Sequence, residues 1–242
     1  MKITIVRHAE PDYENNTLTQ KGFREADLLG RYLSGEKIDY IYSSPLPRAK
    51  YTADAIVKYN KNKNYEVIDS FREFNYHRLN LPYNENHLLW DLRTSFLQEN
   101  LDLYDKDKWT ENKYISSELK SSYIQAVTDF LRIIEKHGYK KDGVGFKVEN
   151  SNRDHIYITC HFGLGSLLMA ELLNVSPNAL LNHTCLVASS YATFVTEERE
   201  EGLALFRMLS FGNVEHLIYN GEEPSFMARF DEIYGDGIGE KD

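Results

Sequence analysis

The chain of 242 residues is long enough for one sizeable α/β domain with an insertion, and it is short for two independent domains. Hydrophobic residues make up 42% and charged residues 27%, a balance that favours a packed core over a disordered chain. The formal net charge of −9 argues against a nucleic-acid-binding protein, and no apolar run approaches the length of a membrane span.

Cysteine usage indicates the compartment. The two cysteines, Cys160 and Cys185, lie far apart without metal-ligand spacing, so neither a disulfide framework nor a metal site is expected. The apolar run before Arg7 is too short for a signal peptide and is typical of a strand. We therefore expect a cytoplasmic protein, and the sequence leaves its oligomeric state open.

The first predicted elements are a strand and a helix. Ile3–Val6 is a β-rich run that leads directly into Arg7 and His8, which places both side chains at the carboxyl end of the strand. Thr19 is a suitable N-cap for a helix in which apolar residues recur at helical spacing.

A second unit of strand and helix follows. Residues 38–42 predict a strand, a helix begins near Pro47, and residues 65–68 predict a third strand. Alternation of strands and helices in units of this size predicts a three-layer α/β/α fold, with a mostly parallel central sheet and helices on both faces.

The middle of the chain has a weaker pattern. Between about residues 75 and 115, polar and aromatic residues mix without a clean period, which we interpret as a partly helical insertion, or cap, over the carboxyl ends of the strands. Residues 116–137 have a strong helical period, whereas residues 140–153 are typical of a surface loop or hairpin. We expect one domain spanning residues 1–242.

The last third of the chain contains another strand that ends in a histidine. Residues 155–160 form a β-rich run, and His161 follows it directly. The remaining predicted elements are a helix at 163–173, a strand pair at 187–195 and 203–210, and an acidic, peripheral tail after Asn220.

Two strand ends and a helix start carry the candidate chemistry. In an open α/β sheet, ligands bind beyond the carboxyl ends of the strands, so His8 and His161 are expected to face one crevice. Arg48, at the start of the second helix, is placed to reach the same crevice, and Arg7 precedes His8. Arginines and helix N–H groups suit a phosphate dianion, so this set predicts a phosphate site.

Five short motifs occur in a fixed order along the chain. They are Arg7-His8-Ala9-Glu10, Leu18-Thr19-Gln20-Lys21-Gly22, Ser43-Ser44-Pro45-Leu46-Pro47-Arg48-Ala49, Arg72-Glu73 and His161-Phe162-Gly163. In this order they resemble the signature of the histidine phosphatase superfamily, which is also called phosphoglycerate mutase-like. The resemblance covers roughly residues 1–75 and 155–220, and it implies a phosphate monoester substrate with neither a metal nor another cofactor.

The resemblance also implies a role for each matched residue that binds phosphate. His8 would attack phosphorus and form a phosphohistidine, which requires its other ring nitrogen to donate to an acceptor such as a backbone carbonyl. Arg7, Arg48 and His161 would hold the phosphoryl oxygens and stabilise charge during transfer.

Glu73 would be the proton donor of the same reaction. It would protonate the leaving alkoxide and then activate water against the phosphohistidine, and both steps near neutral pH require a raised pKa. Glu10 is a rival for this role, and Glu73 has an alternative role as an ion-pair partner of Arg72.

Some positions depart from the family pattern or match it weakly. Mutase-like members often carry an asparagine six residues after the nucleophile; here Glu14 stands there, and Asn15 and Asn16 follow as candidate substrate-binding residues. His77 is a further candidate substrate-binding residue, with a surface role as the alternative. For His216 we expect a structural hydrogen bond, and Phe162 separates the usual His-Gly pair.

Three functions follow from these patterns. The favoured one is hydrolysis of a small phosphate monoester through a phosphohistidine on His8. A mutase of the phosphoglycerate type is an alternative, but acidic residues are at least as frequent as basic ones between residues 75 and 115, which favours hydrolysis. A non-catalytic phospho-ligand-binding module is the third, and the complete motif set argues against it.

Overall fold

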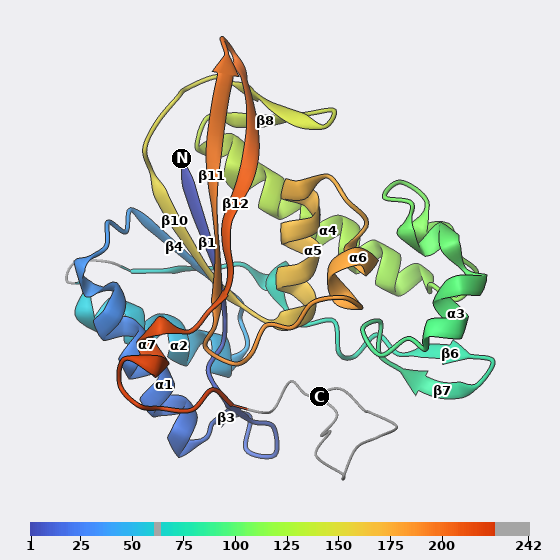
Figure 1. Cartoon of the computed structure of the whole chain (residues 1–242), viewed down its shortest axis with the longest axis horizontal. Coiled ribbons are helices and arrows are strands. Elements are labelled where there is room, and N and C mark those ends of the chain that lie inside the picture. The colour runs from blue at the N-terminus through green and yellow to red at the C-terminus, as the bar shows by residue number, and fades with distance from the viewer. Residues whose placement is uncertain (61–63, 226–242) are drawn as a thin grey trace.

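A mixed β-sheet runs through the middle of the molecule (Figure 1). The computed structural model describes residues 1–60 and 64–225, so most of the expected acidic tail lies outside the described residues. Within them the sheet has eight strands. In spatial order these are β5 (Glu66–Val67), β4 (Tyr40–Ser43), β10 (His155–Cys160), β1 (Lys2–Arg7), β11 (Tyr191–Glu200), β12 (Leu203–Asn213), β9 (Gly145–Val148) and β8 (Tyr139–Asp142).

The sheet has a parallel half and an antiparallel half. Strands β5, β4, β10 and β1 run parallel to their neighbours, as the strand–helix alternation predicts. From β1 onward, β11, β12, β9 and β8 pair antiparallel. The segment 140–153, predicted as a loop or hairpin, is therefore a hairpin that extends the sheet at its far edge. The α/β class is confirmed, and the parallel pairing belongs to the half that carries the N-terminal motifs.

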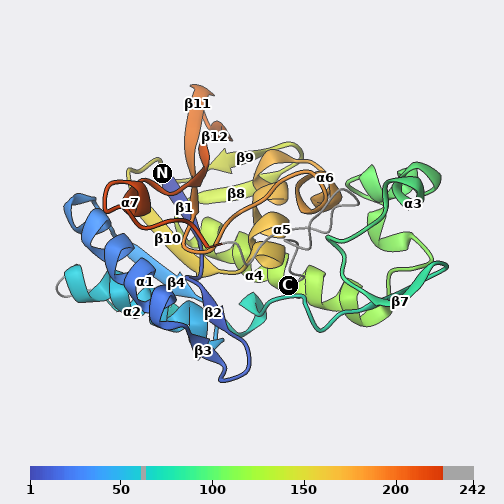
Figure 2. The ribbon, with the colours of Figure 1, turned by 60° about the horizontal axis from the view of Figure 1, so that its bottom comes forward.

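Helices cover both faces of the sheet, which gives the expected three layers (Figures 1 and 2). One layer holds α1 (Gln20–Tyr32), α2 (Pro47–Tyr59) and α7 (Glu215–Ile218), and the other holds α4 (Ser117–Lys136), α5 (Phe162–Leu173) and α6 (Pro177–Leu181). The central strand β1 is buried on both faces: Ile5 packs in the core under α4 and α5, and Val6 packs in the core under α1 and α2.

Helices α1 and α4 begin at side-chain caps, and α5 does not. The Thr19 hydroxyl accepts from Gly22 N–H at the start of α1, as predicted, and Ser116 accepts from Leu119 N–H at the start of α4. Helix α5 begins after His161 without a side-chain cap from its own N-cap residue. Its first N–H groups are therefore available to another acceptor.

The insertion between about residues 75 and 115 is a mixture of short elements. It contains β6 (Leu79–Leu81), β7 (Asn84–His87), α3 (Thr94–Glu99) and 3-10 turns at Leu101–Tyr104 and Trp109–Glu111. In both views these elements lie on the side of the molecule opposite α1 and α2 (Figures 1 and 2). Trp109 packs edge-on against Tyr123 of α4, so the insertion shares its core with that helix layer.

The remaining described elements are short. They are β2 (Pro11–Asp12), β3 (Thr17–Leu18) and 3-10 turns at Leu33–Gly35 and Asp69–Phe71. Strands β2 and β3 pair as a small antiparallel hairpin directly after the Arg7-His8 motif. Among the described helices, none is long and apolar enough to cross a membrane.

Candidate active site

The parallel half of the sheet brings the predicted residues to one end of the molecule. His8 follows β1 and His161 follows β10, and the two strands are paired in register from Lys2–His155 to Arg7–Cys160. Arg48 lies in the first turn of α2 after β4, and Glu73 follows the 3-10 turn after β5. Four neighbouring parallel strands thus each contribute a side chain beyond their carboxyl ends.

His8 is oriented by a hydrogen bond to its own neighbour. Its Nδ1 lies 2.8 Å from the carbonyl oxygen of Ala9, and a carbonyl only accepts, so Nδ1 donates the proton. The other nitrogen, Nε2, keeps its lone pair and accepts from Arg48 Nε at 3.2 Å. Burial, followed by the charges of Arg48 and Arg7, holds the pKa of His8 well below its usual value, which favours the neutral ring.

Two buried arginines supply positive charge beside this ring. Arg7 Nη1 donates to the carbonyl oxygen of Leu186 at 2.6 Å, and its guanidinium carbon lies 5.9 Å from the centre of the Phe162 ring. The Arg48 guanidinium carbon lies 5.3 Å from the centre of the Tyr13 ring. With two fixed guanidinium groups and neutral histidines, the pocket suits a dianion.

The ring of His161 lies against the ring of His8. The two ring centroids are 5.1 Å apart, and His161 Nε2 shares a 2.7 Å hydrogen bond with the Ser44 hydroxyl. Its Nδ1 is buried without a hydrogen-bond partner among the described residues. Burial, with the nearby His8, Arg48 and Arg7, holds the pKa of His161 well below its usual value. A buried nitrogen without a partner is a suitable contact for a ligand oxygen.

Glu73 occupies the uncapped start of α5. Its Oε1 accepts from the backbone N–H groups of Phe74 at 2.9 Å and Leu164 at 3.0 Å, and its Oε2 accepts from Gly163 N–H at 3.1 Å. Burial raises the pKa of Glu73 above its usual value, although these N–H groups and Arg48 act in the opposite direction.

Glu10, the rival acid, lies in a different arrangement. Its carboxylate accepts from the Thr19 hydroxyl at 2.7 Å, at the N-cap of α1. Arg72, the alternative partner of Glu73, instead pairs with Asp69 at 2.7 Å. Glu73 therefore lies at the start of α5, which directly follows His161, and within the electrostatic influence of Arg48, whereas Glu10 lies at the start of α1.

Phe162 stands between His161 and Gly163, where the family commonly has His-Gly, and the structure shows what each of these two residues contacts. A Cβ at Gly163 would lie 2.6 Å from Glu73 Oε1 and 2.4 Å from the Trp90 ring, so only glycine lets both groups approach α5. Trp90 packs edge-on against Phe162 with ring centroids 5.9 Å apart. Phe162 thus contacts both the Arg7 guanidinium and the insertion.

Asn15 and Asn16, the two candidate substrate-binding asparagines, lie in the exposed turn between β2 and β3. Asn15 donates from its side chain to Asp12 at 2.8 Å, and Asn16 has a left-handed backbone with φ of 53°. Tyr13, from the same turn, lies with its ring against the Arg48 guanidinium. Sequence reasoning missed Tyr13, and the available signal was its place in a tight hairpin just after Arg7-His8.

The two weaker histidines are both buried. His77 packs on the rings of Phe74 and Tyr76, and burial lowers its pKa; its Nε2 has no hydrogen-bond partner among the described residues. His216 Nε2 shares a 2.7 Å hydrogen bond with Ser189 Oγ, so the expected structural hydrogen bond is confirmed. Ser189 N–H in turn donates to the carbonyl oxygen of His8 at 3.0 Å.

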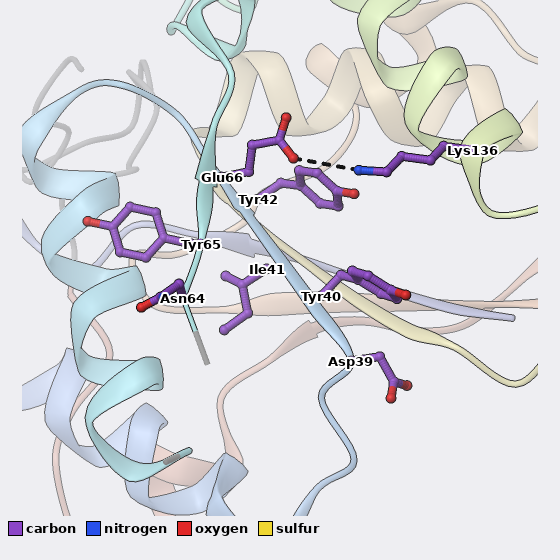
Figure 3. A pocket seen from close by; sticks show the side chains of 8 residues that line it. All are labelled: Asp39, Tyr40, Ile41, Tyr42, Asn64, Tyr65, Glu66 and Lys136. Atoms are coloured by element: carbon purple, nitrogen blue, oxygen red, sulfur yellow. Dashed lines mark ion pairs between the residues drawn. The ribbon is translucent and has the colours of Figure 1, made fainter. Parts of the chain in front are cut away.

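A separate cleft of about 410 Å³ lies at the edge of the sheet (Figure 3). It is lined by residues of β4 and β5, among them Tyr40 and Tyr42, with the Glu66–Lys136 ion pair across it. None of the predicted site residues lines this cleft. In residues 1–60 and 64–225, no cluster of three or more histidine, cysteine or acidic side chains is arranged to hold a metal ion.

Fold and site together define a class: a three-layer α/β protein with buried histidines and arginines where parallel strands end. Residues 3–103 match the model of the histidine phosphatase superfamily (branch 1). The match covers 101 of the 242 residues and includes Arg7, His8, Arg48 and Glu73.

Individual relatives are similar over parts of the chain. Fructose-2,6-bisphosphatase TIGAR of Xenopus tropicalis is 42% identical over 69 residues, which are 24% of this chain and 25% of that protein. Phosphoserine phosphatase 1 of Hydrogenobacter thermophilus is 28% identical over 156 residues, 58% of this chain and 67% of that protein. The match to the first of these relatives thus spans only a quarter of its length.

Solved structures share the fold over most of the chain. Phosphoserine phosphatase from Entamoeba histolytica in complex with 3-phosphoglyceric acid superposes with a TM-score of 0.58 at 20% sequence identity. The match covers 89% of this chain and 98% of that chain. The shared architecture therefore extends well beyond residues 3–103, which match the family model.

Proposed function

We propose that this chain is a phosphatase that hydrolyses a small phosphate monoester through a phosphohistidine on His8. The observation that carries the proposal is the state of the His8 ring. Its Nδ1 donates to the Ala9 carbonyl, so Nε2 presents a lone pair directly beside the Arg48 guanidinium. A neutral imidazole with this tautomer, next to a fixed cation, is what attack on a phosphoryl group requires.

In the first step, the Arg48 Nε–H that donates to His8 Nε2 turns to a phosphoryl oxygen, and the freed lone pair of Nε2 attacks phosphorus as the bond between phosphorus and the ester oxygen breaks. Arg7 and Arg48 hold the phosphoryl oxygens. The Nδ1 of His161, which has no hydrogen-bond partner among the described residues, contacts a further phosphoryl oxygen. Burial raises the pKa of Glu73, which favours its protonated form, and in this form Glu73 gives its proton to the leaving alkoxide. The products of this step are the free alcohol and an enzyme phosphorylated on His8.

In the second step, water replaces the alcohol. Glu73, now ionised, takes a proton from the water as its oxygen attacks the phosphohistidine. The bond between phosphorus and Nε2 breaks, inorganic phosphate leaves, and both His8 and Glu73 return to their starting protonation states. The three backbone N–H donors on Glu73 stabilise its ionised form between the two steps.

The insertion is part of the proposal as a cap that shapes the substrate site. Its support is Trp90, which packs on Phe162 and lies against Gly163, the residue whose N–H donates to Glu73. A cytoplasmic location is also proposed, and it is supported by Cys160, a buried thiol outside any disulfide.

A screen of phosphorylated metabolites with wild type and His8→Ala, in the presence of EDTA, tests the function. Turnover that resists EDTA and disappears in His8→Ala supports it. Turnover that survives His8→Ala would contradict it, and a requirement for added 2,3-bisphosphoglycerate would favour a mutase. A wild type that neither releases phosphate nor takes up acid-labile phosphate would favour a binding module.

A further inference from the structure

Glu25 is a buried carboxyl group outside the phosphate pocket. It lies on α1 with an exposed fraction of 0%. Its Oε2 accepts from the backbone N–H of Glu10 at 2.8 Å, and its Oε1 has no hydrogen-bond partner among the described residues. A carboxyl group buried with one oxygen unpartnered costs stability, so its single hydrogen bond calls for an explanation.

That hydrogen bond reaches the peptide that orients the nucleophile. The Glu10 N–H and the Ala9 carbonyl belong to one planar peptide unit. The carbonyl end of this unit accepts from His8 Nδ1 at 2.8 Å, and the N–H end donates to Glu25. A continuous chain of hydrogen bonds therefore runs from Glu25 through the Ala9–Glu10 peptide to His8.

The rest of the loop is held just as closely by α1 and α2. Ala9 N–H donates to Thr52 Oγ1 on α2 at 3.1 Å. The carbonyl oxygen of Glu10 accepts from Thr19 N–H at 3.1 Å, and a Cβ at Gly22 would lie only 2.1 Å from that oxygen. Glycine at position 22 thus lets α1 approach the loop closely enough for Glu25 to reach it.

We propose that Glu25 is a positioning residue that fixes the Ala9–Glu10 peptide and, through it, the tautomer and orientation of His8. The inference rests on the proposed function of His8 as the nucleophile. Because peptide atoms are coplanar, holding the N–H end also fixes the direction of the carbonyl. Hydrogen bonds in a chain polarise one another, so an acceptor at the N–H end strengthens the hydrogen bond from His8 Nδ1–H to the Ala9 carbonyl.

The charge of Glu25 adds a pH dependence. Burial, together with the nearby charges of Glu10 and Glu222, raises the pKa of Glu25 to about 7, although the Glu10 N–H and Lys21 act in the opposite direction. An ionised acceptor polarises the peptide more strongly than a neutral one. The hydrogen bond from His8 Nδ1–H to the Ala9 carbonyl is therefore expected to strengthen as the pH rises through 7.

Three variants test this role by kinetics and by NMR. Glu25→Leu removes the acceptor, Glu25→Gln keeps an acceptor that does not ionise, and Glu171→Gln is the matched control. Glu171 is a buried carboxylate on α5 that pairs with Lys141 at 3.2 Å. The measurements are kcat and KM for p-nitrophenyl phosphate from pH 5.5 to 8.5, and the ¹⁵N shifts of the His8 ring.

We expect Glu25→Leu to lower kcat about tenfold, with KM within about twofold, because positioning errors act on the reacting geometry. Its His8 signals should lose the Nδ1–H tautomer, and Glu25→Gln should restore it. The ratio of wild-type to Glu25→Gln kcat should be near one at pH 5.5 and rise through pH 7, whereas Glu171→Gln should show a constant ratio.

Unchanged kcat and unchanged His8 shifts in Glu25→Leu would overturn the proposal, as would lost activity with the Nδ1–H tautomer intact. If Glu25→Leu does not fold, Glu25→Gln decides the matter: a pH-independent kcat ratio overturns the role. If wild type hydrolyses no phosphate ester, the proposed function fails, and the ¹⁵N shifts of His8 still test the role of Glu25.

Discussion

Gly163→Ala is the sharpest test of how Glu73 is placed. The added Cβ would lie 2.6 Å from Glu73 Oε1 and 2.4 Å from Trp90, against an ordinary contact of at least 3.4 Å. The carboxylate therefore has to retreat by about 0.8 Å, which breaks its hydrogen bonds to the N–H groups of Gly163 and Leu164. Displacements of about 1 Å cost up to about 100-fold in rate, so kcat should fall by about 10- to 100-fold, or about 1.4 to 2.7 kcal/mol.

Gly165→Ala is the control for this change on the same helix. A Cβ there meets Ile5 at 3.4 Å and Cys160 at 3.5 Å, which are ordinary contacts. It should keep kcat within about twofold and raise stability by up to about 1 kcal/mol, because alanine favours a helix over glycine. The assay is steady-state hydrolysis of an alkyl phosphate, with thermal unfolding of both variants. Full activity of Gly163→Ala would refute the reasoning that Glu73 acts from the start of α5.

Three further predictions concern charge. Arg48→Ala should lower kcat/KM by at least about 100-fold, and it should raise the pKa of His8 in an NMR titration because a nearby cation is lost. Glu73→Gln should lower kcat more for an alkyl phosphate than for p-nitrophenyl phosphate, whose leaving group needs no proton; Glu10→Gln should show no such difference. The pKa of Glu25 is about 7 in the folded chain against an ordinary 4.5, so between these pH values the folded chain holds a proton that the unfolded chain has lost. As the pH rises from 4.5 to 7, the free energy of unfolding of wild type should therefore fall by on the order of 3 kcal/mol relative to that of Glu25→Gln, measured by denaturant unfolding.

The parallel half of the sheet could be predicted from the sequence because the patterns that indicate its strands and helices are local. Runs such as Ile3–Val6 end in chemically distinctive residues, and parallel strands place their carboxyl ends together, so the convergence of His8, His161 and Arg48 follows from order along the chain. The cap at Thr19 is equally local, because it depends on a side chain and an N–H three residues away.

The features that sequence reasoning missed depend on contacts between distant segments. The hairpin at 139–148 joins the sheet through β12, more than 50 residues away, and its own residues do not specify that pairing. Tyr13 reaches Arg48 because the β2–β3 turn folds back over α2, whereas Asn15 is held by Asp12. The partner of Glu73 is a helix start 90 residues later, which a local motif such as Arg72-Glu73 does not reveal.

The most direct test of the central claim is rapid acid-free quenching of wild type during turnover of a ³²P-labelled phosphate monoester. The account predicts a base-stable, acid-labile phosphoryl group on the protein, which maps to His8 by peptide analysis and is absent from His8→Ala. Glu73→Gln should accumulate more of it with p-nitrophenyl phosphate, because release to water needs the base. Turnover at the wild-type rate without any phosphohistidine, or with the label on another residue, would contradict the account.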